Sequence, residues 1–304
     1  MTDRFDAMSV LVAAADAGSL SAAARRLGMP LATVSRWVAE LEERLGTRIL
    51  HRSTRGLSLT EPGEAYLAAC RSILEQVGEA ERVAAGEFSV PKGLLTVSAP
   101  IVFGRLHVLP VIAAFLETYR EVDVRLEQSD RPVSLVEDRI DAAIRIGHLP
   151  DSRLRARRIG EVRRVICASP AYLAERGRPE RPDDLAGHDC VTFENLMAPD
   201  RWQFGEGQAQ RTVTVKSRMV VNTAEAAVDA AVAGLGLTRV LSYQAVEAVA
   251  AGRLEIVLQD HEPEPWPVSI LYGGGLVPQK LRMFVDFAAP RLEARLANGR
   301  GGRA

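Results

Sequence analysis

The chain has 304 residues, about twice the usual length of a single domain, so we expect at least two separately folded parts. Apolar residues make up 47% of the sequence and charged residues 25%, which excludes a chain that is disordered throughout. The formal net charge of −1 excludes a uniformly basic nucleic-acid coat protein, so any contact with nucleic acid depends on a local arrangement of basic residues.

The cysteines and the N-terminus predict the compartment. Cys70, Cys167 and Cys190 are odd in number and far apart, which is typical of reduced, buried thiols. Charged residues interrupt the N-terminal segment at Asp3, Arg4, Asp6 and Asp16. The segment therefore lacks the apolar core of a secretion signal, and no apolar run of 18 residues follows it. We expect a cytoplasmic protein without membrane contact.

The N-terminal residues predict three helices. Apolar residues recur every three or four positions over residues 3–17, and Gly18 ends this helix. Ser21 is the predicted N-cap of a short helix at 22–27, and a third helix is predicted from Leu31 to Leu45. The residues of the third helix that should face inward are Val34, Val38, Leu41 and Leu45. Two helices joined by a tight, glycine-containing turn form a helix-turn-helix.

A hairpin and a long helix follow. Residues 48–60 predict two short strands around a turn at 53–56, the pattern of a wing. Its apolar side is predicted to consist of Ile49, Leu57 and Leu59. Thr60 then caps a long helix, with Pro62 in the first turn, where a missing N–H costs little.

The long helix carries a heptad pattern. Apolar or small residues recur at alternating spacings of four and three, at Tyr66, Cys70, Ile73, Val77, Ala80 and Ala84. Such a seam indicates a helix that pairs with another helix, and it favours a homodimer. The alternative is a helix that packs on its own domain.

From residue 92 onwards the pattern alternates between strands and helices, which predicts an α/β domain with largely parallel sheets. The predicted strands are Leu94–Ser98, Val122–Glu127, Ala142–Ile146, a strand beginning near Arg163, Cys190–Phe193, Thr212–Ser217, Leu235–Val240 and Val268–Tyr272. The predicted helices are Gly104–Tyr119, Thr223–Ala233 and Pro278–Leu296.

Residues 18–63, GSLSAAARRLGMPLATVSRWVAELEERLGTRILHRSTRGLSLTEPG, resemble the DNA-binding region of LysR-type transcriptional regulators. Further segments resemble the effector domain of that family: residues 94–100, 141–152, 163–174, 183–193 and 233–240. The resemblance implies a winged helix-turn-helix with a linker helix, followed by a two-lobed α/β effector domain like a periplasmic binding protein. It also implies a dimer, or a tetramer of two dimers, that binds double-stranded DNA and a small-molecule effector without a cofactor.

The predicted organisation has four parts. Residues 1–60 form the DNA-binding domain, 61–91 the linker and dimerisation segment, and 92–296 the effector domain, with a disordered tail at 297–304. Lobe I comprises 92–164 and 266–296, and lobe II comprises 165–265.

The sequence departs from the family pattern twice. Pro30-Leu31 stands where the family usually begins its recognition helix with Ser-Pro, so a side-chain N-cap is missing. Trp37 stands where the family often has a polar residue, and it either alters base preference or adds packing.

The candidate DNA-binding residues lie on the second helix of the helix-turn-helix, which enters the major groove in such motifs, and on the wing. They are Ser21, Thr33, Ser35, Arg36, Trp37, Arg52, Thr54 and Arg55. Arg36 can donate two parallel hydrogen bonds to guanine, and a solvated surface arginine is the alternative. Capping of the short helix would explain the presence of Ser21 equally well, and solubility alone would explain the charged residues of the wing. A dimer presenting two such helices predicts inverted-repeat operators.

Ligands of open α/β sheets bind outside the carboxyl ends of parallel strands. This rule and the resemblance select Ser98, Ala99, Pro100, Ser129, Arg145, Gly147, Thr192, Phe193, Asn222 and Thr223 as effector-binding residues. Ordinary helix caps would explain the same small polar residues. Arg145 is the predicted counter-charge for an organic anion, assisted by Arg131 or Arg239, and Arg239 either reaches a cleft or pairs with an acid.

The alternatives come from other classes of protein. No nucleophile, base or metal-ligand spacing is evident, and the five histidines are scattered, so we expect neither an enzyme nor a metal site. A solute-binding protein without DNA function would share the two-lobed domain. A thiol redox sensor would use Cys167 and Cys190, which lie in one lobe.

Overall fold

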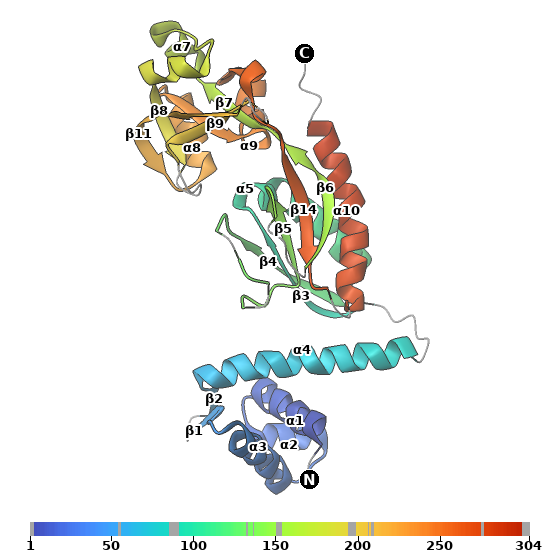
Figure 1. Cartoon of the computed structure of the whole chain (residues 1–304). Coiled ribbons are helices and arrows are strands. Elements are labelled where there is room, and N and C mark those ends of the chain that lie inside the picture. The colour runs from blue at the N-terminus through green and yellow to red at the C-terminus, as the bar shows by residue number, and fades with distance from the viewer. Residues whose placement is uncertain are drawn as a thin grey trace. The chain divides into compact units, whose positions relative to one another are not determined.

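The computed structural model describes residues 3–53, 56–84, 91–131, 133–135, 137–149, 154–193, 199–205, 207, 210–274 and 277–299. The chain divides into two compact units, Met1–Ser89 and Val90–Ala304. Both are drawn in Figure 1, and each is described by itself.

The described residues of the N-terminal unit form four helices and a two-stranded antiparallel hairpin. They are α1 (Arg4–Ala17), α2 (Leu20–Leu27), α3 (Leu31–Leu45), β1 (Leu50–Ser53), β2 (Gly56–Leu59) and α4 (Glu61–Ala84). Leu11, Val34, Val38 and Ile49 are completely buried in its core. The predicted helices α1 and α3 and the predicted wing are confirmed. Leu45 was predicted to face inward, but it is 38% exposed at the last position of α3.

The predicted cap of α2 is wrong. Ser19, not Ser21, has the extended backbone of an N-cap, and its Oγ accepts a hydrogen bond from the backbone N–H of Ala22 at 3.1 Å. Because α2 starts at Leu20, Ser21 already belongs to its first turn and is exposed. The pattern of residues fitted a cap at either serine, and only the backbone distinguishes them.

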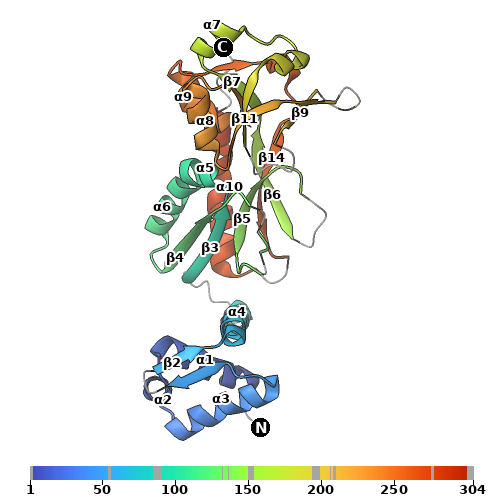
Figure 2. The same ribbon diagram turned by 90° about the vertical axis from the view of Figure 1, so that its left-hand side faces the viewer.

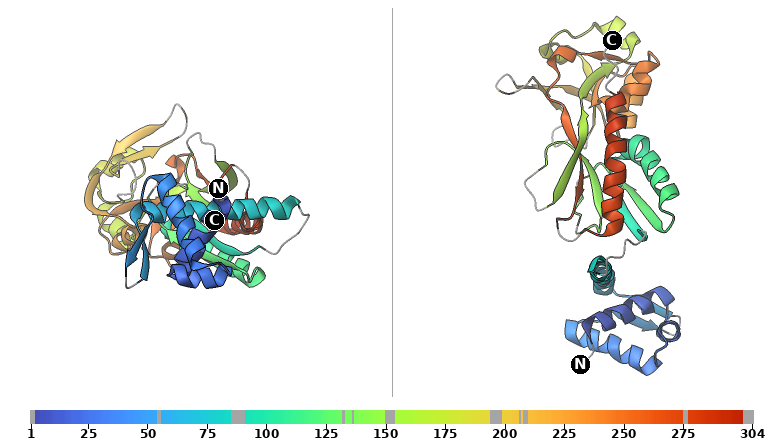
Figure 3. Two further views of the ribbon diagram at one scale, coloured as in Figure 1. Left: turned by 90° about the horizontal axis from the view of Figure 1, so that it is seen from below. Right: turned by 90° about the vertical axis from the view of Figure 1, so that its right-hand side faces the viewer.

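Lobe I of the C-terminal unit is a five-stranded sheet of order β4-β3-β5-β14-β6. Its strands are β3 (Gly93–Ala99), β4 (Val122–Gln128), β5 (Ala142–Ile146), β6 (Arg155–Val162) and β14 (Trp266–Tyr272). One face packs against α5 (Ile101–Phe103), the π-helix η1 (Gly104–Val108), α6 (Leu109–Thr118) and α10 (Gln279–Gly299). Figure 2 shows α5 and α6 along the sheet, and Figure 3 shows α10 beside α6.

Lobe II is a second five-stranded sheet, of order β11-β8-β12-β7-β13. Its strands are β7 (Arg164–Ala168), β8 (Asp189–Phe193), β11 (Lys216–Val221), β12 (Leu237–Leu241) and β13 (Glu255–Val257). One face packs against α8 (Ala224–Val232) and α9 (Ser242–Ala250). The other face packs against α7 (Pro170–Arg176), the 3-10 helix η2 (Pro182–Gly187) and the hairpin of β9 (Arg201–Phe204) and β10 (Arg211–Thr214). A short 3-10 turn, η4 (Gln259–His261), follows β13.

The prediction of largely parallel sheets is wrong, because both sheets are mixed. β3 is parallel to β4 and β5, but β14 is antiparallel to β5 and β6. β8 is parallel to β11 and β12, but β7 is antiparallel to β12 and β13. The antiparallel pairs arise where the chain passes between the lobes, since β14 enters the first sheet after the chain has returned from lobe II.

Other boundaries also differ from the predictions. The segment Thr212–Ser217 is not one strand, because β10 ends at Thr214 and β11 begins at Lys216 in another sheet. The helix predicted from Gly104 begins with α5 at Ile101. Helix α10 continues to Gly299, so the predicted disordered tail begins too early, and its last five residues lie outside the described part.

Contrary to the sequence-based expectation, one run of 18 residues, Ile101–Thr118, is apolar and long enough to cross a bilayer by length and composition. Helices α1 and α2 would pass only as a sharply bent pair. In lobe I this run has another role, because Phe103, Val108, Ile112 and Phe115 are buried against the sheet. We assign it to the core of the lobe.

Candidate DNA-binding helix and effector site

Helix α3 presents Arg36 opposite its buried face. Val34 and Val38 are completely buried, whereas the Arg36 side chain is 66% exposed. Its Nε lies 3.7 Å from Oε1 of Glu40 one turn later, and an ion pair this exposed contributes about 1 kcal/mol at most. The guanidinium can therefore leave this contact to bind a base edge.

The start of α3 lacks a side-chain cap, as the sequence predicted. Pro30 is the N-cap residue and makes no side-chain hydrogen bond, while its carbonyl accepts the N–H groups of Thr33 and Val34. Leu31 and Ala32, which carry the preceding N–H groups, are both exposed. Uncapped N–H groups at a helix start are suited to a backbone phosphate.

The remaining candidates on the helix-turn-helix differ in exposure. Thr33 and Ser35 are half-buried on the flanks of α3, and Ser21 is exposed on α2. Trp37 is half-buried and packs against the core of the unit. Packing therefore accounts for part of the Trp37 side chain.

The wing is fixed to the helices by backbone hydrogen bonds. One carboxylate oxygen of Glu42 on α3 accepts the N–H groups of Ile49 and Leu50, at 2.9 and 3.1 Å. The N–H of Leu57 donates to the carbonyl of Gly18 at 3.3 Å. Of the predicted wing contacts, the backbone of Arg52 lies in β1, but its side chain and both Thr54 and Arg55 lie outside the described part.

The heptad seam of α4 serves two purposes. Cys70 is completely buried in the core of the unit, and Tyr66 packs against that core. Ile73 is 37% exposed, Val77 is half-buried and Ala80 is exposed, while the side chain of Ala84 is outside the described part. The first two positions therefore pack on their own unit, and the pattern from Ile73 onwards remains for another helix.

In lobe I the predicted effector residues gather at the carboxyl end of the sheet. Ser98 and Ala99 end β3 and are completely buried, and Pro100 precedes α5. The N–H of Ser129 donates to the carbonyl of Ala99 at 3.0 Å, and the N–H of Gly147 to that of Pro267 at 2.9 Å. These backbone groups hold the strand ends together.

Arg145 is compensated by its own lobe. Its guanidinium lies 3.4 Å from Oγ of Ser98 and also donates to the carbonyl of Ile144. Burial lowers the pKa of Arg145, and the carboxylates of Asp130 and Asp138 oppose that shift. Asp130 also accepts the first N–H of α5 at 3.1 Å. The positive charge predicted for an anionic ligand therefore already has two carboxylate neighbours.

In lobe II the predicted residues lie at the ends of β8 and β11. Thr192 is buried, and its Oγ1 lies 2.6 Å from Oγ of Ser217. Phe193 packs against the core of lobe I, as does Ala224 at the start of α8, so this edge meets the first lobe. Thr223 is the N-cap of α8 and accepts the N–H of Ala226, which is the role the alternative assigned to it. Asn222 is exposed beside it.

A further cavity lies elsewhere between the lobes, and its residues were not predicted. It has a volume of about 670 Å³ and is lined from both lobes, including Arg105, His107, Arg163, Glu225, Tyr243 and Arg295. The lining also includes Glu161 and Glu247. His107 lies in the π-helix η1, and its ring contacts those of Phe103 and Tyr243. Neither ring nitrogen of His107 has a hydrogen-bond partner in the described part of the chain.

The burial of His107 predicts that the stability of the folded chain depends on pH. Burial, with a smaller contribution from Arg295, lowers the pKa of His107 from 6.5 to about 4. As pH falls below 6.5, the imidazole of His107 becomes protonated in the unfolded chain but stays neutral in the folded chain until about pH 4. Protonation therefore favours the unfolded chain, and the stability of the fold decreases as pH falls from 6.5 to 4. The difference in unfolding free energy between pH 7 and pH 4 should be on the order of 2 kcal/mol, because solvent screening reduces the effect of the shift for a partly exposed ring. The substitution His107→Phe keeps an aromatic ring but removes the titrating group. The difference in Tm between wild type and His107→Phe should therefore be constant above pH 6.5 and change below it. A difference in Tm that stays constant at every pH would contradict this.

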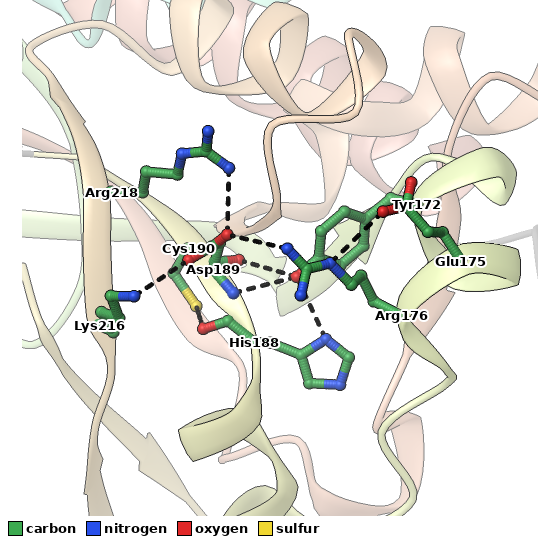
Figure 4. Close-up of polar contacts among 8 residues, drawn as sticks. All are labelled: Tyr172, Glu175, Arg176, His188, Asp189, Cys190, Lys216 and Arg218. Atoms are coloured by element: carbon green, nitrogen blue, oxygen red, sulfur yellow. Dashed lines mark hydrogen bonds and ion pairs between the residues drawn. The ribbon is translucent and has the colours of Figure 1, made fainter.

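His188 and Cys190 take part in a hydrogen-bonding cluster with Tyr172 and Asp189 (Figure 4). The Tyr172 hydroxyl lies 3.2 Å from Nδ1 of His188 and accepts the N–H of Asp189 at 3.0 Å. The carboxylate of Asp189 is surrounded by the cations of Arg176, Lys216 and Arg218, at 3.8, 3.6 and 3.1 Å. Burial alone would raise the pKa of Asp189, but these cations lower it. Among the described residues, no three His, Cys, Asp or Glu side chains form a metal-binding group.

The two cysteines of lobe II are too far apart for a disulfide. Cys167 on β7 and Cys190 on β8 are separated by β12, which pairs with both strands. Two strand spacings amount to about 9.6 Å, whereas a disulfide needs Cα atoms within about 7 Å. The side chains also lie in the cores on opposite faces of the sheet. The redox pair is therefore contradicted by the register of the sheet.

These thiols should also be unreactive. Burial raises the pKa of Cys167 and Cys190 to about 12 in both cases, with Asp189 adding to the shift of Cys190. Because the thiolate is the reactive form, peroxide at pH 7.5 should leave both cysteines reduced in the folded chain. Mass spectrometry of peptides after treatment in native buffer and in urea should show modification only in urea. A Cys167–Cys190 crosslink formed in native buffer would refute this assignment.

Arg239 follows neither of its predicted alternatives. Its guanidinium is stacked over the Trp202 ring at 5.4 Å and donates to the carbonyl of Arg201 at 3.3 Å. The ring belongs to lobe II, so Arg239 does not reach the strand-end residues, and no acid pairs with it in the described part. A sequence pattern cannot reveal a buried cation that stacks on an aromatic ring from another strand.

A winged helix-turn-helix followed by a two-lobed α/β unit defines a DNA-binding regulator that carries its own ligand-binding domain. The model of the bacterial regulatory helix-turn-helix protein, lysR family, matches residues 5–64, and that of the LysR substrate binding domain matches residues 89–293.

Relatives match along nearly the whole chain. It is 33% identical to a probable HTH-type transcriptional regulator LtrA from Klebsiella pneumoniae, over 94% of each chain. The structure of CrgA, a LysR-type transcriptional regulator from Neisseria meningitidis, has a TM-score of 0.61 at 31% identity and covers 96% of this chain and 99% of its own. A full-length AphB variant has the same TM-score at 28% identity, covering 94% and 99%. The chain therefore belongs to the LysR family of transcriptional regulators, with a DNA-binding and an effector-binding domain.

Proposed function

We propose that the protein acts as a homodimer, or as a pair of dimers, that binds inverted-repeat DNA through two copies of α3 and changes its binding when a small molecule occupies the effector domain. Exposed Arg36 opposite the buried residues Val34 and Val38 is the observation that carries the DNA part of this proposal. The effector part is supported by the membership of the family and by the strand ends that meet between the lobes.

The proposed readout divides between α3 and its surroundings. Arg36 donates two hydrogen bonds to a guanine, with Thr33 and Ser35 beside it on the helix. Ser21, the uncapped start of α3 and the wing residues Arg52, Thr54 and Arg55 bind the sugar-phosphate backbone. Trp37 contributes its exposed edge while its remainder stays packed.

The proposed effector site is the set of strand-end residues of both lobes. Ser98, Ala99, Pro100, Ser129 and Gly147 contribute from lobe I; Thr192, Phe193, Asn222 and Thr223 contribute from lobe II. Arg145, beside Ser98, supplies the positive charge for an anionic ligand, and the charges of Asp130 and Asp138 offset part of it. A ligand shifts the regulator only by binding one arrangement of the lobes more tightly than another.

The relatives are named transcriptional regulators, and we propose that this chain likewise regulates transcription in the cytoplasm without catalysing a reaction. No cofactor is needed for that role.

Selection from a pool of random duplexes tests the proposal. Purified full-length protein should enrich an inverted repeat whose half-sites lie about 34 Å apart, or a multiple of that distance. Enrichment of a single unrepeated site, or of no sequence at all, would contradict it.

The seam of α4 gives a separate prediction about assembly. Replacing Ile73 by aspartate should convert the dimer to monomers, because a charge would be buried in the helix pair, while the unit keeps its own core. Light scattering coupled to size exclusion measures the mass. Ser72→Asp, on the adjacent exposed position of α4, should remain dimeric. An Ile73→Asp protein that keeps the dimer mass would show that this face is not the interface.

A further inference from the structure

Among the described residues of lobe II, two arginines are buried and no acidic residue is buried. Arg164 at the start of β7 is 9% exposed, and Arg239 on β12 is 8% exposed. Each is stacked on a tryptophan, Arg164 on Trp266 at 4.4 Å and Arg239 on Trp202 at 5.4 Å. Each donates one hydrogen bond to a backbone carbonyl, of Glu264 and Arg201 respectively.

The hydrogen-bonding capacity of the pair is only partly used. In the described part of the chain, Nε of Arg164 and Nη1 of Arg239 are buried and have no hydrogen-bond partner. Glu262, which lines the smaller of the two neighbouring cavities, forms an ion pair with Arg163, whose Nη1 lies 3.2 Å from both carboxylate oxygens. Burying two like charges without an anionic partner is unfavourable, so the binding of a negative group at this place offsets part of that cost.

Two neighbouring cavities give such a group room. A small one of about 10 Å³ lies between Arg164 and Arg239, which holds no more than a water-sized group. A second, of about 320 Å³, has a lining that includes Arg164, His148, Gln210, Trp266 and the acidic residue Glu264. Arg164 and Gln203 line both. None of the ten predicted effector residues lines either cavity.

We propose that Arg164 and Arg239 form an anion-binding site, in which a small carboxylate or phosphate compound occupies the larger cavity with its charged group on Arg164. The positive charge of Arg239 lies on the far side of Arg164 from the anion and attracts it electrostatically. The side-chain amides of Gln203 and Gln210 donate further hydrogen bonds to the anion, and the Trp266 ring packs against the apolar part of the ligand. Because Glu264 and Trp266 belong to the segment that returns from lobe II to lobe I, the site lies beside the connection between the lobes.

Calorimetric titration and thermal unfolding of the full-length chain with inorganic phosphate and with acetate test the proposal. Wild type should bind at least one probe saturably and show a rise in Tm that saturates with it. Arg164→Met should lose this binding, and Arg239→Met should weaken it about tenfold or more, as expected for lost charge-assisted hydrogen bonds. Preference for phosphate or for acetate identifies the class of ligand.

The variants carry their own controls. Methionine keeps the apolar stem of arginine and removes a buried charge, so the Tm of each variant without anion should not fall. Arg253→Met removes a half-exposed arginine of lobe II and should bind as wild type does. The general stabilisation by phosphate, which does not saturate, should remain in every variant. Absence of saturable binding of both probes to wild type, or unchanged binding to Arg164→Met, overturns the proposal.

Discussion

Replacing Gly63 by alanine is expected to destabilise the N-terminal unit by about 3 kcal/mol or more and to abolish DNA binding. A Cβ at this position would lie 2.0 Å from the carbonyl oxygen of Ile49 and 2.8 Å from its carbonyl carbon. Both are backbone atoms, and Ile49 is completely buried. Neither the backbone at Ile49 nor the first turn of α4 can therefore move away without breaking the junction of the wing and α4. The Oγ1 of Thr60, which accepts the N–H of Gly63 at 3.0 Å, ties the same junction.

Urea unfolding followed by the fluorescence of Trp37, the tryptophan of this unit, measures the effect. Gly46→Ala is the matched control, since Gly46 has a φ of +67° but nothing within 4 Å of its Cβ position. Strain at that residue costs only about 1 kcal/mol. Equal losses in the two variants would show that the close approach at Ile49 is not what requires glycine.

Replacing Arg36 by alanine is expected to weaken binding to the selected operator about tenfold or more, because a bidentate contact to guanine contributes roughly 1–3 kcal/mol of discrimination. Binding to random duplex should change little, and the Tm should stay the same, since the contact between Arg36 and Glu40 is exposed to solvent. Fluorescence anisotropy with both duplexes measures the two affinities. Arg44→Ala, an exposed arginine in the last turn of the same helix, should bind the operator nearly as wild type does.

The salt dependence separates base contact from phosphate contact at Arg36. Loss of a phosphate contact lowers the slope of log K against log salt by about one, whereas loss of a base contact leaves the slope unchanged. We expect an unchanged slope with lower affinity for the operator. Equal weakening on operator and random duplex, with a smaller slope, would mean that Arg36 only holds the backbone.

The local elements of the DNA-binding unit were predictable from the sequence. Regular apolar spacing and glycine stops set α1 and α3, because these signals act within one or two turns of helix. The same locality explains the wrong cap of α2, where Ser19 and Ser21 offer the same chemistry two residues apart. The link between Glu42 and the wing joins residues seven and eight positions apart and has no sequence signature.

The C-terminal unit was less predictable because its register depends on distant pairing. β6 was missed since its sequence, RARRIGEV, is dominated by charge, which is how an edge strand of a sheet is kept from pairing further. Helix α9 was missed within an alanine- and valine-rich stretch that continues directly from β12.

The candidate site shows the same limit. Ser98, Thr192 and Thr223 were found because strand ends and helix starts follow from the order of elements, but the carboxylates around Arg145 come from a loop that the rule does not consider. The buried pair Arg164 and Arg239 depends on two tryptophans contributed by other strands. Only the folded chain brings these rings and charges together.

Methylation interference on the selected operator tests most directly whether α3 is presented twice to the major groove. N7 of guanine lies in that groove, so a methyl group there blocks an arginine contact. Guanine methylation should prevent binding at one position in each half-site, with the two positions related by the symmetry of the repeat, and Arg36→Ala should lose this sensitivity. Binding that tolerates methylation of every guanine in the operator would contradict the account.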